Sequence, residues 1–170
     1  PPPATLTTDI AYRGRPVAFV VAGTLEAAIE GAEAIRPTYT TAPAFTSLIE
    51  QPGMVREAVK PVTAGDATQA MARAVTRHKA DYVSPPQHHN PIEMLSTTAV
   101  WENGQLTIYE STQSSSNTKG AVMRNMRLTP EQVTVKSPQI GGGFGQRGGA
   151  QRQTALVARA AMLLGRPVKL

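Results

Sequence analysis

Cysteine is absent from this chain of 170 residues, which excludes disulfide bonds, thiolate metal ligands, iron–sulfur ligation and a cysteine nucleophile within it. Aromatic residues make up only 5% of the sequence, so aliphatic side chains must build most of the core. No apolar run approaches the roughly 18 residues that cross a bilayer, and no secretory leader opens the sequence. Because the sequence begins with Pro1 rather than Met, we expect the chain to be processed or cut from a longer protein.

Acidic residues are scarce in the last third of the chain. Residues 116–170 hold nine Lys or Arg and a single acid, Glu131, whereas residues 1–115 hold eight basic and eleven acidic residues. This asymmetry predicts an anionic partner, and a solvated basic face is the alternative explanation. Phe144 is the only aromatic residue in the basic part, so no stacking platform for nucleic acid is visible, and a phosphate-bearing cofactor fits better.

Apolar periodicity and turn residues predict a mixture of helices and strands. In the first half, we expect a βαβ-like unit with a strand at 17–22, a helix at 25–36 with Thr24 as its N-cap, and a strand at 38–42. A linker at 51–65 and a helix at 67–75 follow. In the second half, we expect strands at 97–101 and 105–109, a helix at 116–127, a strand at 133–135, a helix at 150–164 and a strand from 168. Asn103-Gly104 between the first two strands is a strong hairpin signal.

A glycine-rich loop at residues 141–149, GGGFGQRGG, lies between a predicted strand and a predicted helix. Its Gly-x-Gly-x-x-Gly spacing matches the dinucleotide-binding fingerprint, but no acid follows Glu131 to bind a ribose, and no Lys-Ser or Lys-Thr completes a phosphate loop. Two interpretations remain: a tight turn that packs strand against helix, or a loop whose backbone contacts a flat or anionic ligand, with Phe144 as a wall.

The densest polar cluster is residues 87–93, QHHNPIE. His88, His89 and Glu93 are candidate metal ligands, although adjacent histidines on an extended chain point to opposite faces. One of these histidines, or Glu93, is a candidate general base. The alternative is a polar loop whose side chains satisfy buried backbone groups.

These motifs occur in a characteristic order. They are GRPVA at 14–18, TLEAA at 24–28, QHHNPIE at 87–93, STQ at 111–113, GGGFG at 141–145 and GRPVKL at 165–170. The ordered series resembles the molybdenum-binding subunit of the xanthine dehydrogenase and aldehyde oxidase family, and its His-Asn-Pro-Ile-Glu form is most like bacterial three-subunit aldehyde oxidoreductases. The resemblance implies an α+β fold, with residues 1–60 as the C-terminal part of an α/β-hammerhead-like domain and residues 61–170 as the beginning of the molybdopterin-binding domain.

The resemblance also implies roles for individual residues. Gln87 matches the glutamine whose amide hydrogen-bonds an oxo ligand of molybdenum, and no protein atom ligates the metal directly. In the family, the backbone of one loop contacts the molybdenum centre and the pterin. The matching residues here are Gly142, Gly143, Phe144 and Gly145. Gln113 and Arg147 correspond to further cofactor-binding positions.

The implied activity is hydroxylation of an aldehyde or an N-heteroaromatic substrate, with water as the oxygen source. The pterin would carry molybdenum, in bacteria often in the cytosine dinucleotide form, and electrons would leave through an iron–sulfur subunit and an FAD-binding subunit. The general-base glutamate of the family is expected beyond Leu170, so Glu93 is not that residue and this chain alone should be catalytically incomplete. The stretch at 146–148, QRG, lacks the glutamate that recognises purines in xanthine enzymes. A non-catalytic assembly module derived from the family is the alternative.

Overall fold

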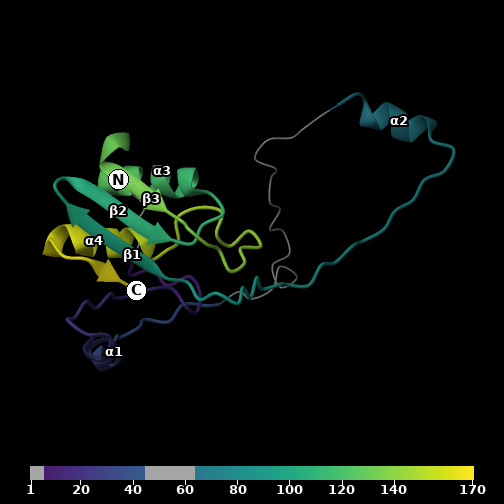
Figure 1. Ribbon diagram of the computed structural model, residues 1–170. Helices are drawn as coiled ribbons and strands as arrows, with labels where there is room; N and C mark the ends of the chain where they lie inside the picture. The colour runs from purple at the N-terminus through teal and green to yellow at the C-terminus, as the bar shows by residue number, and fades with distance from the viewer. Residues whose placement is uncertain (1–5, 45–63) are drawn as a thin grey trace. The chain divides into compact units, whose positions relative to one another are not determined.

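The computed structural model describes residues 6–44 and 64–170 (Figure 1). By their contacts these residues fall into two units, one made of the N-terminal segment up to Arg36 together with residues 87–170, the other of residues 37–86. The first unit contains the sheet and the candidate site. The linker expected at 51–65 lies, apart from its last two residues, outside the described part of the chain.

A β-hairpin forms the centre of the first unit. Strand β1 (Thr97–Glu102) pairs antiparallel with β2 (Gln105–Glu110), so that Glu102 faces Gln105 across a two-residue turn. Asn103 and Gly104 both have positive φ, of 51° and 75°, as a tight hairpin turn with the twist of the strands requires. The hairpin prediction is confirmed to within one residue at the end of each strand.

Two shorter strands extend this hairpin into a mixed sheet. Strand β3 (Val133–Lys136) runs parallel to β2, and β4 (Val168–Lys169) runs antiparallel to β1, which gives the order β3-β2-β1-β4. The parallel pair needs a crossover, and helix α3 (Ser115–Met126) supplies it, followed by a short 3₁₀ turn. The predicted strands at 133–135 and from 168 are therefore confirmed.

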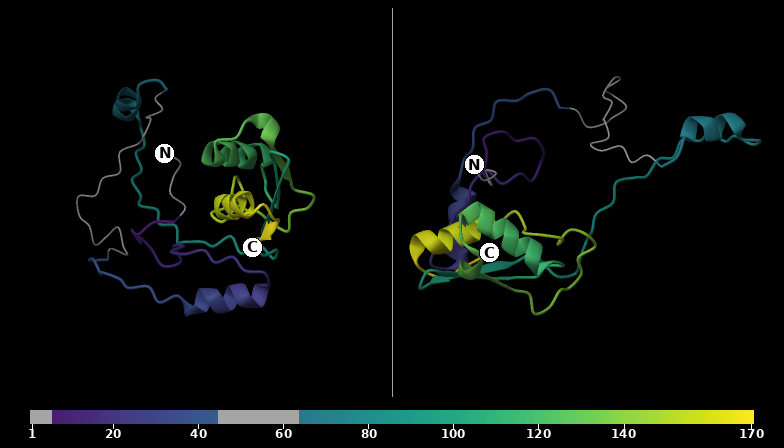
Figure 2. Two further views of the ribbon diagram at one scale, coloured as in Figure 1. Left: turned by 90° about the vertical axis from the view of Figure 1, so that its left-hand side faces the viewer. Right: turned by 90° about the horizontal axis from the view of Figure 1, so that it is seen from above.

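Helices α3 and α4 (Thr154–Leu164) cover one face of the sheet (Figure 2). Helix α4 packs on β1, α3 packs on β3, and the two helices contact each other. The core between these layers is aliphatic, as the scarcity of aromatic residues predicts. Its buried members are Ala99, Leu106, Ile108, Val122, Val133, Val157, Ala158, Ala161 and Val168.

The ends of the two helices follow local side-chain chemistry. The Ser114 hydroxyl accepts the N–H of Asn117 and caps α3, and Gly165 ends α4 in the left-handed region at φ 59°. Helix α4 begins at Thr154 rather than at the expected residue 150. The preceding segment turns instead, because the Gln151 side chain donates to two carbonyls of the glycine loop.

The prediction of a βαβ-like unit near the N-terminus is wrong. Helix α1 (Leu25–Ala34) is present, with the Thr24 hydroxyl accepting from Ala27 N–H at 3.2 Å. Neither 17–22 nor 38–42 forms a strand within the described residues. An apolar run gives a strand only where a neighbouring backbone pairs with it, and no described segment does so here. Phe19 instead packs its side chain against the core.

The second unit holds helix α2 (Ala67–Arg73), at the position that the sequence predicts. The Asp66 carboxylate caps it by accepting the N–H of Gln69 at 2.8 Å. Across residues 6–44 and 64–170, no helix is both long enough and apolar enough to cross a membrane.

Candidate functional site

The glycine-rich loop connects β3 to α4, and at Gly142 and Gly143 it has no room for a larger residue. Gly142 has a φ of +101°, and a Cβ there would come within 3.1 Å of the Phe144 ring and of Pro91. Gly143 is buried, and a Cβ at this position would collide with the side chain of Gln113. The loop backbone therefore lies directly on two other segments, the one around Pro91 and the end of β2.

Gln113, just after β2, holds the loop through its side-chain oxygen. This Oε1 accepts the backbone N–H groups of Gly145 and Arg147, at 3.1 and 3.2 Å. The Gln113 backbone N–H donates in turn to the Arg147 carbonyl at 2.8 Å, and the Thr112 hydroxyl donates to the same carbonyl at 3.1 Å. The end of β2 and the loop are thus joined by several hydrogen bonds.

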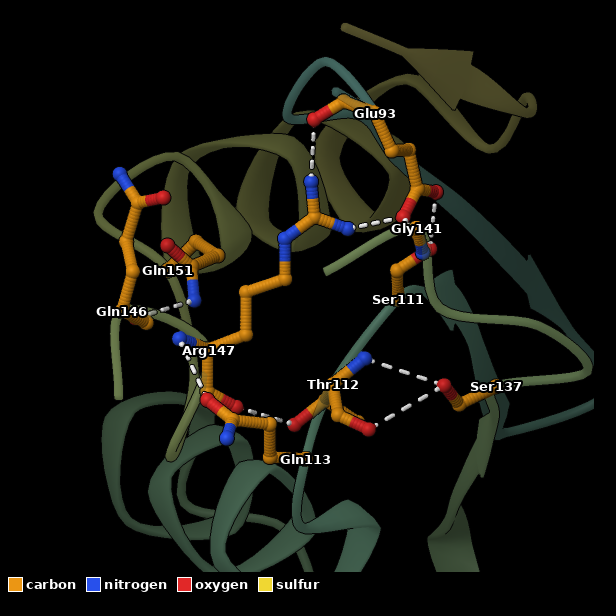
Figure 3. A network of polar contacts seen from close by, with 9 residues as sticks. All are labelled: Glu93, Ser111, Thr112, Gln113, Ser137, Gly141, Gln146, Arg147 and Gln151. Carbon is orange, nitrogen blue, oxygen red and sulfur yellow. Dashed lines mark hydrogen bonds and ion pairs between the residues drawn. The ribbon is translucent and has the colours of Figure 1, made fainter. Parts of the chain in front are cut away.

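A partly buried ion pair joins the loop to the Gln-His-His segment, residues 87–93 (Figure 3). The Arg147 guanidinium, fully buried, donates to the Glu93 carboxylate through one nitrogen and to the Glu93 carbonyl, at 2.6 Å, through another. The same carboxylate accepts the Ser111 hydroxyl and the Gly141 N–H, the latter at 2.6 Å. One acid therefore contacts two positions on the loop and the end of β2.

These contacts keep the Glu93 carboxyl charged. The Ser111 hydroxyl and the Gly141 N–H lower its pKa below the ordinary value of 4.5, and the Arg147 guanidinium lowers it further. Partial burial raises the pKa by less than these contacts together lower it. A charged carboxylate with its oxygens engaged in this way neutralises Arg147, and this arrangement favours the structural interpretation of Glu93 over a general base or a metal ligand.

The middle of the loop keeps its backbone donors free. Among the described residues, no group accepts a hydrogen bond from the N–H of Gly142, Gly143 or Phe144. Phe144 has a φ of +49°, a left-handed conformation that is uncommon outside glycine, and its side chain is 70% exposed. A bare backbone stretch beside an exposed aromatic ring suits a ligand that is recognised by main-chain contacts.

The Gln-His-His segment, residues 87–93, contacts the glycine loop only through residues 89–93. Pro91 lies against Gly142, and a Cβ on Gly145 would be 3.9 Å from His89 Nε2. Gln87 and His88 are exposed, and neither side chain hydrogen-bonds within the described part of the chain. The described residues contain no cluster of three or more His, Asp or Glu side chains that could hold a metal ion.

Sequence reasoning missed the ion pair and the residues that support it. Glu93 and Arg147 are 54 positions apart, in two different motifs. The only sequence signal for the pair is that one of these motifs contains an acid and the other a base. Ser111, which also links the network, lies in the STQ motif at 111–113, whereas Ser137 gives no sequence signal beyond its place after a strand.

The sequence model of the family described as "Molybdopterin cofactor-binding domain" matches residues 49–170. The aldehyde oxidoreductase molybdenum-binding subunit PaoC of Escherichia coli (strain K12) is 30% identical over 156 residues, which are 90% of this chain and 21% of that protein. Xanthine dehydrogenase of Emericella nidulans is 29% identical over 163 residues, 92% of this chain and 12% of that protein. The chain thus spans about a fifth of the first relative's length and less of the second.

A solved structure, that of quinoline 2-oxidoreductase from Pseudomonas putida 86, superposes on this chain with a TM-score of 0.70. The superposition covers 87% of this chain and 20% of the other, at 22% sequence identity. At that identity the likeness concerns the fold alone, and it agrees with the small mixed sheet described above.

Proposed function

Because this chain belongs to the molybdopterin cofactor-binding domain family of the xanthine dehydrogenase and aldehyde oxidoreductase enzymes, we propose that its glycine loop and the segment beside it bind molybdopterin. The observation that supports this is the free backbone at residues 142–144, held in place from both sides with its N–H groups unpaired among the described residues. Unpaired main-chain donors in a tight glycine loop are the groups that an anionic or polar planar ligand can use.

We assign each residue a role in that site. Gly142, Gly143, Phe144 and Gly145 contribute backbone contacts to the pterin and the metal centre. Gln113 sets their position, since its oxygen already holds two loop amides. Gln87, whose side chain is exposed, would offer its amide to the molybdenum centre, and no protein atom would ligate the metal. Arg147 acts by holding the loop, because its guanidinium is buried on Glu93.

The proposal extends to the domain organisation. Residues 1–60 are proposed as the C-terminal part of an α/β-hammerhead-like domain, and residues 61–170 as the start of the cofactor-binding domain. The family match from residue 49 supports a boundary in this region.

For the whole protein, we propose oxidation of an aldehyde or an N-heterocycle with water as the oxygen source. Molybdenum on the pterin, in the cytosine dinucleotide form, supplies two-electron redox chemistry when bound. The name of the aldehyde oxidoreductase relative supports an aldehyde, and the lack of a carboxylate at Gln146 and Arg147 disfavours a purine. Electrons pass to an iron–sulfur subunit and an FAD-binding subunit. In this proposal the general base is a glutamate beyond Leu170, as the family resemblance implies, and Glu93 has a structural role in the ion pair.

The test is the metal and pterin content of the intact protein and of two glycine variants. We expect about one molybdenum per copy in the unaltered protein, and a large loss of both metal and pterin in Gly143→Ala, because the new methyl group would push Gln113 and the loop apart. Gly149→Ala is the matched control, since a Cβ there meets nothing closer than 3.9 Å.

An intact protein that lacks molybdenum, from a host that loads related enzymes, would contradict the proposed function. That result would favour the non-catalytic assembly module. Equal cofactor content in Gly143→Ala and Gly149→Ala would instead contradict the assignment of the loop.

A further inference from the structure

Arg147 is the charged residue of the glycine loop, but its guanidinium is not accessible to a cofactor. Its side chain is fully buried, and two guanidinium nitrogens are taken by the carboxylate and the carbonyl of Glu93. The third, Nε, is buried with no hydrogen-bond partner in the described structure. The charge is neutralised inside the protein, so it offers little attraction to an anion outside.

Glu93 holds the loop at two points that enclose its free backbone. Its carboxylate accepts the N–H of Gly141 at one end of the loop and the guanidinium of Arg147 at the other (Figure 3). The three unpaired N–H groups belong to residues 142–144, between these two points. Gln113 adds a second support on the far side, at Gly145 and again at Arg147.

The conformation held between these points is one that the free chain would not favour. Phe144, a residue with a Cβ, has a φ of +49°. Such a conformation costs on the order of 1–2 kcal/mol for an ordinary residue and persists only where the surroundings impose it. The contacts of Glu93 with Gly141 and Arg147 are among the surroundings that can impose it.

From this geometry we propose that Glu93 and Arg147 act together as a clamp, a pair of positioning residues that fixes the loop backbone in its cofactor-binding conformation before the cofactor arrives. The proposal deepens the proposed function and depends on it for the identity of the ligand. It also gives Arg147 a role different from a direct cofactor contact. A preorganised loop loses less conformational entropy on binding, so the clamp should raise affinity and slow cofactor loss.

The test compares four clamp variants in the intact protein: Glu93→Gln, Arg147→Met, Arg147→Lys and the double variant Glu93→Gln/Arg147→Met. Glu102→Gln and Arg159→Met are the controls, because both residues are exposed and lie outside the network. Two quantities are measured. One is amide hydrogen exchange at residues 141–147 after the cofactor has been removed, and the other is the rate at which loaded protein loses pterin.

We expect Glu93→Gln and Arg147→Met each to speed up exchange in the loop and loss of pterin by about tenfold or more, with β1 and β2 amides unchanged. Arg147→Lys should restore much of the protection lost in Arg147→Met, since it keeps a charge for Glu93. The double variant should be less affected than the two single effects combined, because no buried charge is left without its partner. The controls should match the unaltered protein.

Loop exchange and pterin loss at unaltered rates in both single variants would overturn the clamp. So would exchange that rises equally in β1 and β2, which would indicate general destabilisation. Ser111→Ala removes one bond to Glu93 and serves as a milder variant if the others fail to fold. A protein that never contains pterin contradicts the proposed function, while the exchange measurement still decides whether the clamp holds the loop.

Discussion

At the scale of single residues, the charge of Glu93 decides how firmly the loop is held. The carboxylate is stabilised by a hydroxyl, a backbone N–H and a buried guanidinium, and its pKa lies below the ordinary value in the folded protein. A carboxyl group whose pKa is lowered by folding stabilises the fold above its unfolded pKa. This contribution is lost as the pH falls through the lowered, folded-state value.

Glu93→Gln should therefore destabilise the protein in a pH-dependent way. Near neutral pH we expect a loss of about 1–3 kcal/mol in the free energy of unfolding, less than for a fully buried pair because the Glu93 side chain is 35% exposed. The gap to the unaltered protein should begin to narrow as the pH falls below 4.5, where the Glu93 carboxyl of the unfolded chain becomes protonated, and should close once the pH has passed the lowered pKa of Glu93 in the folded protein. Denaturant unfolding at several pH values measures this difference in the free energy of unfolding, with Glu102→Gln as the control. A gap that stays constant with pH contradicts this account.

At the scale of elements, the hairpin is the part of the fold that the local sequence specifies most fully. Buried residues alternate with less buried ones along its two strands, and its turn uses Asn103 and Gly104, both at positive φ. Local chemistry alone specifies this element, because partners in a hairpin are close in sequence.

Gly104→Ala should lower the free energy of unfolding by about 1–2 kcal/mol, because alanine is strained at a φ of +75° although space for its methyl group is free. Gly23→Ala is the comparison, since Gly23 has the same open surroundings without a positive φ. We expect that change to be neutral or stabilising by less than about 1 kcal/mol. Chemical denaturation of the two variants side by side measures the difference, and equal stabilities would show that the turn does not constrain Gly104.

The elements that the sequence predicts well are those with local signals. The hairpin, α3, β3 and β4 lie within one or two residues of their predicted places, since caps, turns and periodicity mark them. Helix α4 begins four residues late because the Gln151 side chain bonds to the loop and its backbone N–H donates to the carboxylate of Glu110, which is 41 positions away. Residues 17–22 form no strand because strand formation depends on a partner that an apolar run does not specify. The Glu93–Arg147 pair was missed for the same reason.

At the scale of the whole molecule, the first unit is assembled from two stretches of chain. Phe19, from the N-terminal stretch, packs against the core built by residues 97–168. In addition, the guanidinium carbon of Arg152, just before α4, lies 4.9 Å from the centre of the Tyr12 ring. The match to the cofactor-binding family starts only at residue 49. The compact unit and the family domain are therefore not the same set of residues.

Phe19→Ala should destabilise the same cooperative unit as a substitution in the sheet. We expect a loss of about 1–3 kcal/mol, below the range for a fully buried phenylalanine because Phe19 is half-buried. Tyr82→Ala, at a side chain that is 87% exposed, should leave the stability unchanged. Thermal unfolding of the intact protein followed by tryptophan fluorescence reports on Trp101 in β1. An unchanged Tm for Phe19→Ala would show that the N-terminal segment does not contribute to the stability of this core.

The buried guanidinium of Arg147 has a consequence for the order in which the molecule assembles. Desolvating this cation before residue 93 arrives would be costly, so the loop can close only together with a segment 54 positions earlier. The hairpin needs contacts across a few residues and can form well before that. We therefore expect the glycine loop to be the last feature completed during folding. A nascent protein would then pass through a stage in which the hairpin is already formed and the loop has not yet closed.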